Sequence, residues 1–309
     1  MKPLRALQCN FALVSKRQTA RKGFPMLAAV NSQFAPSQHR IDPAGYGYAG
    51  ILSLDDIRRA APSAFAEQAH DSRSERYAYI PTSDIIGGMQ AAGFLPVKAF
   101  QSKSRTLDKR EHAKHCIRFR REDQLDKAEA REVILINSHD GSSAYKLSAG
   151  IFRLICSNGL IVGTEDTRQT VRHSGDALGE VIEGATRIVE DFEQVACDID
   201  LMKGTRLPEP LKLAFANAAI EARFAGDEKP VTAEQVLRPR RHADIGDDTW
   251  AIFNRIQENV IKGGMYGKSK DKLGRMQQRR TRAVNGIDQN DTLNRALWCL
   301  SVEVAKLAK

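Results

Sequence analysis

The sequence predicts an α+β protein, in which helices surround a central, mainly antiparallel sheet and a helical C-terminal half follows. Three observations predict this class. Short β-branched or alternating runs lie between about residues 95 and 165. One long helical stripe then occupies residues 178–202, and amphipathic segments continue from residue 210 to the end. We therefore expect the fold to have a sheet-containing part followed by a helical part.

Three regions follow from this pattern. Residues 1–45 have mixed polarity and no sustained period, which predicts a flexible basic arm. Residues 46–175 are the mixed, sheet-containing region, and residues 176–309 are the helical region with a basic loop at 262–286. We expect residues 46–309 to form one compact unit.

The first elements of the sheet region follow from local signals. Pro81-Thr82-Ser83-Asp84 predicts a short helix through Met89, with Thr82 or Ser83 as its N-cap and Gly93 after its end. Strands are expected at Ala99–Ser104 and Cys116–Arg121. In the second strand Ile117 and Phe119 alternate with Arg118 and Arg120, so its two faces differ in kind.

A hairpin is the clearest prediction within the sheet. The runs Val133–Ile136 and Ala144–Leu147 flank a turn rich in Asn, Asp, Gly and Ser. Beyond it, Asn158-Gly159 can supply the positive φ angles of a tight turn. The six residues before Asn158 fit either a strand or a short buried helix.

The helical half begins with the longest element. Its stripe starts after a cap at Ser174 or Asp176 and ends at Gly204. Four further helices are expected, at Pro210–Phe224, Thr232–Leu237, Asp247–Lys262 and Asp291–Leu307.

Composition limits the class of protein. Apolar residues make up 42% of the chain, which suits a packed core, and no apolar run approaches the eighteen residues of a membrane helix. The five cysteines are scattered without close pairs, which favours reduced thiols and a cytoplasmic location. We expect no membrane contact.

Charge is segregated along the chain. Residues 1–41 contain seven basic residues and no acid, and residues 262–282 contain eight basic residues and one acid. These two segments together carry a charge of +14. Because the whole chain has a net charge of +9, the rest of it carries −5. Such segregation is typical of binding to a phosphate backbone. We expect DNA rather than RNA as the partner, although the charge pattern itself does not distinguish the two. Two alternatives stay open, namely solvated segments without a partner and docking on an acidic protein.

The candidate contacts are the basic residues of the C-terminal segment, a secondary set in the predicted strands, and two aromatic side chains that could stack on bases. Arg153 is a lone charge in an apolar run, so it either reaches the surface or is held by a carboxylate or phosphate. For Trp250 a place in the core is the alternative. The residues are Lys268, Lys270, Lys272, Arg275, Arg279, Arg280 and Arg282; then Arg118, Arg120 and Arg153; and finally Trp250 and Tyr266.

No motif predicts catalysis, a metal or a cofactor. Gly263–Ser269 ends like a phosphate-binding loop, but Lys262 stands where that loop needs its first glycine. The run His112–Cys116 offers three potential ligands, but structural zinc would need a second pair, and none lies nearby. His139-Asp140 lies at the predicted hairpin tip, where a turn explains Asp140 and Gly141.

Three blocks of the sequence, taken together in their order and spacing, point to one family: Asn137–Tyr145, Phe152–Leu160 and Thr249–Glu258. They resemble the phage- and plasmid-associated proteins grouped as domain of unknown function 932, and the resemblance covers roughly residues 80–305. The chain departs from the family pattern after the third block. There the family pattern is expected to end with an aromatic or histidine residue, whereas this chain has Ile261–Gly264. The resemblance implies that the protein is encoded on a mobile element and resides in a bacterial cytoplasm. It implies no particular activity.

The resulting hypothesis is a non-enzymatic nucleic-acid-binding protein of a mobile element, acting on single-stranded DNA in replication or recombination. By analogy of architecture, the mix of sheet, long helix and basic edge is similar to single-strand-annealing proteins. The main alternative is an interaction protein that inhibits a host defence system by docking on a host protein. A metal-dependent nuclease ranks below both, because no acidic cluster with metal-binding spacing is evident. The sequence leaves homo-oligomerisation open.

Overall fold

The computed structural model describes residues 50–68, 70, 79–103, 110–153, 158–163, 167–173, 176–224, 229–270 and 274–309. All of them belong to one unit, Pro36–Lys309. The predicted arm at residues 1–45 lies outside the described residues.

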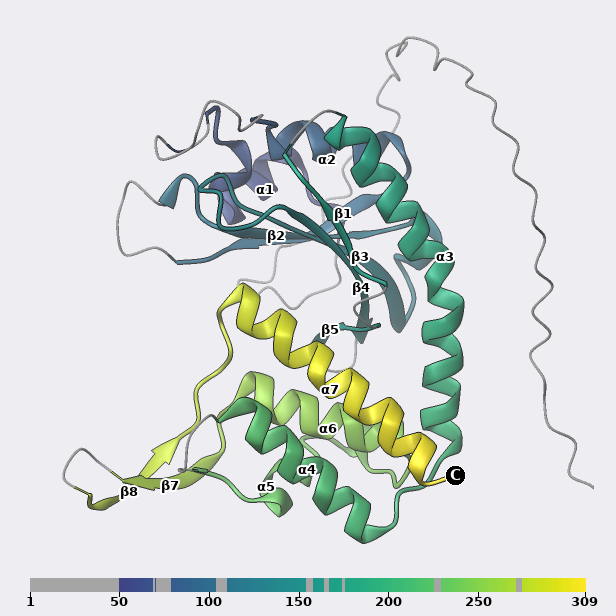
Figure 1. Cartoon of the computed structure of the whole chain (residues 1–309), viewed down its shortest axis with the longest axis vertical. Helices are drawn as coiled ribbons and strands as arrows, with labels where there is room; N and C mark the ends of the chain where they lie inside the picture. Colours follow the sequence, from purple (N-terminus) through teal and green to yellow (C-terminus); the bar gives the residue numbers. More distant parts are fainter. Residues whose placement is uncertain are drawn as a thin grey trace, which may run out of the picture. The chain divides into compact units, whose positions relative to one another are not determined.

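Figure 1 shows the central sheet, whose six described strands are all antiparallel to their neighbours. The order along the sheet is β1-β2-β3-β4-β5, and β6 pairs with β4 beside β5. The strands are β1 (Leu95–Gln101), β2 (His115–Arg120), β3 (Glu129–Asn137), β4 (Tyr145–Arg153), β5 (Asn158–Ile161) and β6 (Gln169–Val171). This confirms the α+β class with an antiparallel sheet.

The apolar face of the sheet carries the main core. Ile117, Val133 and Leu147 lie on this face, because alternate side chains of a strand point to the same side. Two helices cover it, α2 (Thr82–Ala91) and the long α3 (Ala177–Gly204). The Asp176 side chain caps α3 by accepting a hydrogen bond from the Gly179 N–H, as the sequence predicts.

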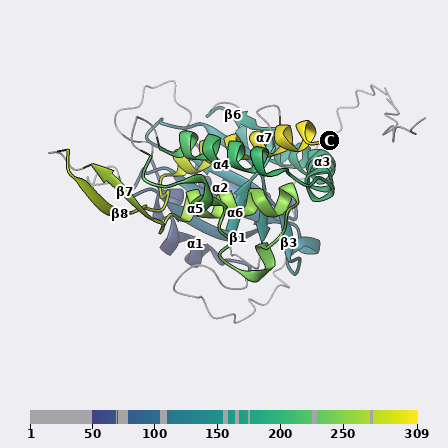
Figure 2. The same cartoon turned by 90° about the horizontal axis from the view of Figure 1, so that it is seen from below.

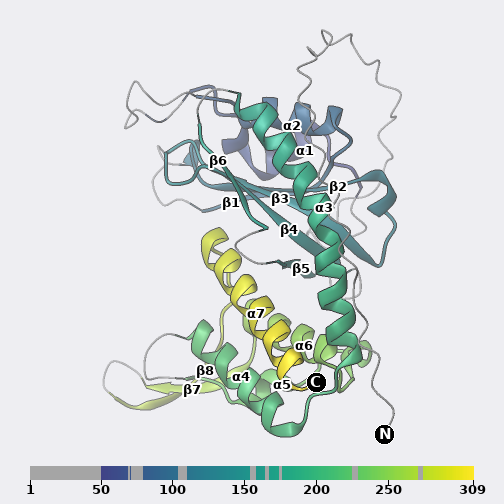
Figure 3. The ribbon, with the colours of Figure 1, turned by 45° about the vertical axis from the view of Figure 1, so that its right-hand side comes forward.

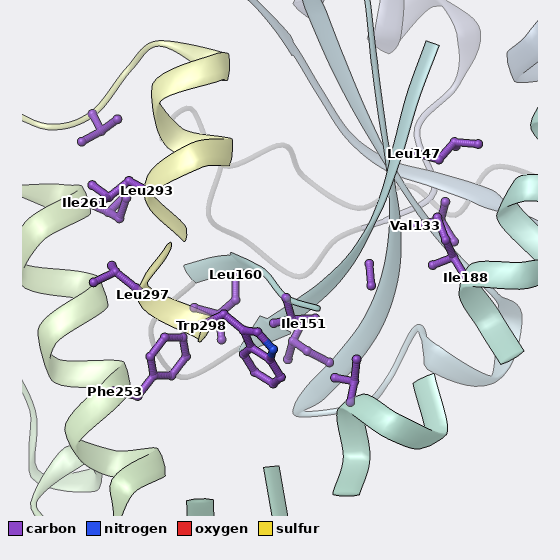
Figure 4. Close-up of a cluster of buried hydrophobic side chains, with 14 of the residues drawn as sticks. Val133, Leu147, Ile151, Leu160, Ile188, Phe253, Ile261, Leu293, Leu297 and Trp298 are labelled. Carbon is purple, nitrogen blue, oxygen red and sulfur yellow. The ribbon is translucent and has the colours of Figure 1, made fainter. Parts of the chain in front are cut away.

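The helical region confirms the predicted helical C-terminal half. Figure 3 shows α3 passing from the sheet to these helices. Figure 4 shows Phe253 and Trp298 beside Leu160 and Ile151, so the core continues from the sheet into the helices. The helices are α4 (Glu209–Arg223), α5 (Ala233–Leu237), α6 (Thr249–Lys262) and α7 (Ile287–Leu307). At the N-terminal side lie α1 (Leu54–Ala60) and the 3-10 helix η1 (Pro62–Phe65). Three-residue 3-10 turns lie at η3 (Glu122–Gln124) and η5 (His242–Asp244).

Two local predictions are wrong. Asn158-Gly159 is not a turn but the start of β5, where Gly159 pairs with Phe152. The residues before it include the end of β4, and 154–157 lie outside the described residues. Thr82 does not cap α2, whose N-cap is Pro81, because the Thr82 hydroxyl is buried and bonded to other side chains.

The basic loop expected at 262–286 is instead a β-hairpin. Its strands are β7 (Tyr266–Lys270) and β8 (Met276–Arg280), which pair in antiparallel register. Figures 1 and 2 show this hairpin extending away from the helices. The alternation of long and small side chains in β7 matches the period of a strand, which the charge count concealed.

Candidate nucleic-acid interface

The β7–β8 hairpin sorts its side chains onto two faces. Tyr266 pairs with Arg280, and Lys270 pairs with Met276, so these residues share what we call the outer face. The complete outer face is Tyr266, Lys268, Lys270, Met276, Gln278 and Arg280, and the opposite, inner face is Gly267, Ser269, Gln277 and Arg279. Every outer-face residue is exposed.

The outer face combines a ring with positive charge. Tyr266 and Met276 are each 60% exposed, so both are open to a partner. The Arg280 guanidinium lies 5.8 Å from the centre of the Tyr266 ring, within the range of a cation–π contact. Lys268 on this face forms no ion pair with a described residue, in contrast to the many paired cations of the body. The face therefore offers stacking and cations together.

The base of the hairpin is fixed to the helices. Lys268 N–H donates to the Pro230 carbonyl at 3.0 Å, and a Cβ added at Gly267 would lie 1.6 Å from that same oxygen. The inner face thus approaches the chain at Pro230, and only glycine fits there. Arg223 adds a bond from its guanidinium to the Arg282 carbonyl at 3.1 Å. A hairpin held this way presents its outer face in a defined direction.

The two nucleic-acid contacts predicted in β2 are buried in the sheet and lie outside the hairpin. Arg118 and Arg120 are 7% and 3% exposed, and both pair with the carboxylate of Glu132 on β3. The Arg120 Nε lies 2.8 Å from Glu132 Oε1, and Arg118 Nη2 donates to the Leu160 carbonyl at 2.9 Å. A phosphate cannot reach these two guanidinium groups without opening the sheet face, so their placement speaks against a surface contact.

Two glycines make room for Arg118. A Cβ added at Gly159 would lie 2.0 Å from Arg118 Nη1, and one at Gly150 would lie 2.9 Å from Nη2. Gly159, in the block Phe152–Leu160, is therefore required because a buried guanidinium approaches its backbone closely.

Arg153 is held by carboxylates, which is one of the two alternatives from the sequence. It lies 3.2 Å from Asp244 and 3.3 Å from Glu129, and it is 8% exposed. Trp250 is 5% exposed, and its Nε1–H donates to Glu129 at 3.2 Å. Its ring packs beside Phe253 and Trp298. Trp250 is thus part of the core, whereas Tyr266 remains a candidate for stacking.

The remaining predicted contacts divide into two groups. Arg275, Arg279 and Arg282 are exposed, at the hairpin's tip side, inner face and base, respectively. Lys272 lies outside the described residues.

Sequence reasoning missed a buried histidine cluster at one end of the sheet. His139 and His115 are fully buried, with ring centres 5.5 Å apart, and His173 lies 6.2 Å from His139. Burial lowers the pKa of His115 to about 4, and burial together with the neighbouring histidines lowers the pKa of His139 to about 3. The signal in the sequence was that five of the seven histidines fall between residues 70 and 173.

The cluster does not form a metal centre. Within the described ranges, no three His, Cys, Asp or Glu side chains converge as metal ligands. No helix in these ranges is long and apolar enough to cross a membrane.

Comparison with known proteins decides the family. Residues 69–298 match the family described as domain of unknown function DUF932. The chain belongs to this family. Two proteins of Escherichia coli strain K12, UPF0380 protein YfjQ and UPF0380 protein YafZ, are each 45% identical to it over 250 residues. That alignment covers 81% of this chain and 90% of each relative. No solved structure matches it.

Proposed function

We propose that this DUF932 protein is a non-enzymatic nucleic-acid-binding protein of a phage- or plasmid-type mobile element. It holds single-stranded DNA on the outer face of the β7–β8 hairpin, in replication or recombination in a bacterial cytoplasm. The observation that carries the proposal is the outer face itself, where Tyr266 lies among Lys268, Lys270 and Arg280.

Single strands suit this face better than a duplex. Stacking on Tyr266 needs the flat surface of an unpaired base, which a duplex keeps covered by its neighbours. The lysines and Arg280 neutralise phosphates and release counterions, a contribution that does not depend on sequence. The fixed hairpin base limits the conformational entropy lost on binding, since the outer face is already ordered.

The test is a salt-titrated binding series with fluorescently labelled single-stranded and double-stranded oligonucleotides, in EDTA and in Mg²⁺. We expect tighter binding to the single strand, a steep dependence on salt, and equal affinity in the two buffers, because neutralisation by Lys and Arg needs no metal. Cleavage of the probe that depends on Mg²⁺ would indicate a nuclease. Absence of binding below micromolar protein at low salt would refute the proposal and favour a protein partner.

A further inference from the structure

A hydrogen-bond network ties the segment around α2 to one end of the sheet. The Thr82 hydroxyl, in the first turn of α2, lies 3.0 Å from Nε2 of His139 and 3.0 Å from Nε2 of His115. Asn137 on β3 donates to the same hydroxyl at 3.1 Å, and its own Oδ1 lies 2.9 Å from His173 Nε2. Ser63 of η1 joins through its hydroxyl, 3.1 Å from His115 Nδ1. We call these six residues the histidine clasp.

Counting hydrogens assigns a protonation state to each ring around Thr82. His115 Nδ1 lies 3.2 Å from the Ala113 carbonyl, which can only accept, so Nδ1 carries the hydrogen and Nε2 of the neutral ring accepts from Thr82. The hydroxyl has one hydrogen and two lone pairs, and Asn137 uses one lone pair. The remaining lone pair accepts the Nε2–H of His139. The hydrogen and both lone pairs of the Thr82 hydroxyl are thus all engaged in hydrogen bonds when both rings are neutral.

A second proton on either ring has no place in this network. On His115 it would go to Nε2 and replace the acceptor that Thr82 needs. On His139 it would go to Nδ1, a buried atom without a hydrogen-bond partner among the described residues. Protonation would therefore either break the bond to Thr82 or bury a charge without an acceptor.

The charges around His139 add to this effect. His115, His173 and His112 all face it and would repel it once charged, whereas Asp140 is the carboxylate that attracts it. The rings of Tyr79 and Tyr145 also pack here, at 5.0 Å from His139 and 4.6 Å from His173, respectively. His70 packs on His112 at 5.3 Å. If these histidines become charged on acidification, their positive charges outnumber the one carboxylate, Asp140, that attracts His139.

We propose that the histidine clasp is an acid-sensitive joint, which holds η1 and α2 on the sheet when its rings are neutral and releases them when the rings are protonated. Tyr145 reinforces the closed form, since its hydroxyl donates to the Ile80 carbonyl at 2.7 Å, just before α2. Release would uncover Ile85, Ile86 and Met89, which α2 packs into the core.

The direction and size of the pH effect follow from the linkage between proton binding and opening of the clasp. Because the closed state has histidine pKa values below the value near 6.5 of an open chain, closure is favoured above pH 6.5 and weakens as the pH falls toward 4. Between pH 7 and pH 5, a histidine shifted to a pKa of about 4 or 3 raises the opening constant about 20-fold, so His115 and His139 together raise it about 400-fold.

Hydrogen exchange on the full chain tests the proposal, with protection factors compared for peptides covering residues 79–92 and 249–262. We expect protection of α2 to fall by two orders of magnitude or more from pH 7 to pH 5, while α6 keeps its protection, since none of the hydrogen bonds that define the clasp involves a residue of α6. Equal loss in both helices, or no loss in α2, would overturn the proposal.

Two variants sharpen the test. His139→Gln keeps a polar side chain that does not titrate, so the loss of α2 protection should shrink about 20-fold. His242→Gln, outside the clasp in η5, should behave as the parent protein. A His139→Gln protein that folds and still loses α2 protection to the parent's extent would refute the role of His139, and if it fails to fold, the comparison of the two helices in the parent protein decides.

Discussion

Replacing Glu132 with Gln should destabilise the protein more than any surface change. Gln keeps the size of the side chain but removes the charge that two buried arginines share. The side chains of Glu132, Arg118 and Arg120 are 1%, 8% and 3% exposed, so water cannot replace the carboxylate. Removing one partner of a buried ion pair costs about 3–5 kcal/mol, a large share of the roughly 5–15 kcal/mol that stabilises a typical domain.

Urea denaturation followed by the fluorescence of Trp250 and Trp298 measures this loss. We expect the midpoint to fall by about 1 M or more, given a slope of roughly 3 kcal/mol per M for a chain of this size. Glu183→Gln is the matched control, because its pair with Arg187 on α3 is exposed and should contribute nothing measurable. An apolar triple variant, with Met at 118 and 120 and Leu at 132, should recover most of the stability. A midpoint for Glu132→Gln equal to that of the parent would refute the reasoning.

Two further predictions follow from the same geometry. Gly159→Ala should lower the free energy of unfolding by about 1–3 kcal/mol, because the added methyl meets an Arg118 side chain that is bonded to Glu132 and Leu160; an unchanged urea midpoint would contradict this. Trp250→Phe should reduce thermal stability by leaving Glu129 without its indole donor and a gap in the core, yet leave the affinity for single-stranded DNA unchanged; a loss of affinity in folded protein would restore Trp250 as a contact.

Local signals were enough to predict much of the fold. The β3–β4 hairpin followed from the runs Val133–Ile136 and Ala144–Leu147 around a turn rich in Asn, Asp and Gly, in which Gly141 adopts a φ of 74° and Asp140 accepts from the Ser142 N–H at 2.8 Å. The stripe of α3 and the charge of the β7–β8 segment were equally visible. The strands within that segment were missed, because a count of lysines and arginines says nothing of their alternation.

Long-range pairing could not be predicted. Arg118 and Arg120 alternate with Ile117 and Phe119, which reads as an exposed polar face until β3 brings Glu132 beside them. The six residues of the histidine clasp are spread between Ser63 and His173 without a regular spacing, so no sequence motif predicts it. In both cases the partners meet only through sheet register and helix packing.

The central claim is that one face of the β7–β8 hairpin contacts single-stranded DNA, and the adjacent residues Arg279 and Arg280 test it most directly. Each substitution to Ala removes the same charge, but Arg280 lies on the outer face beside Tyr266 and Arg279 on the inner face. We predict that Arg280→Ala weakens binding about fivefold in 0.1 M salt and lowers the log–log salt slope by about 0.7, the contribution of one phosphate contact on a single strand. Arg279→Ala should leave both nearly unchanged, and equal losses in the two variants would contradict a defined binding face.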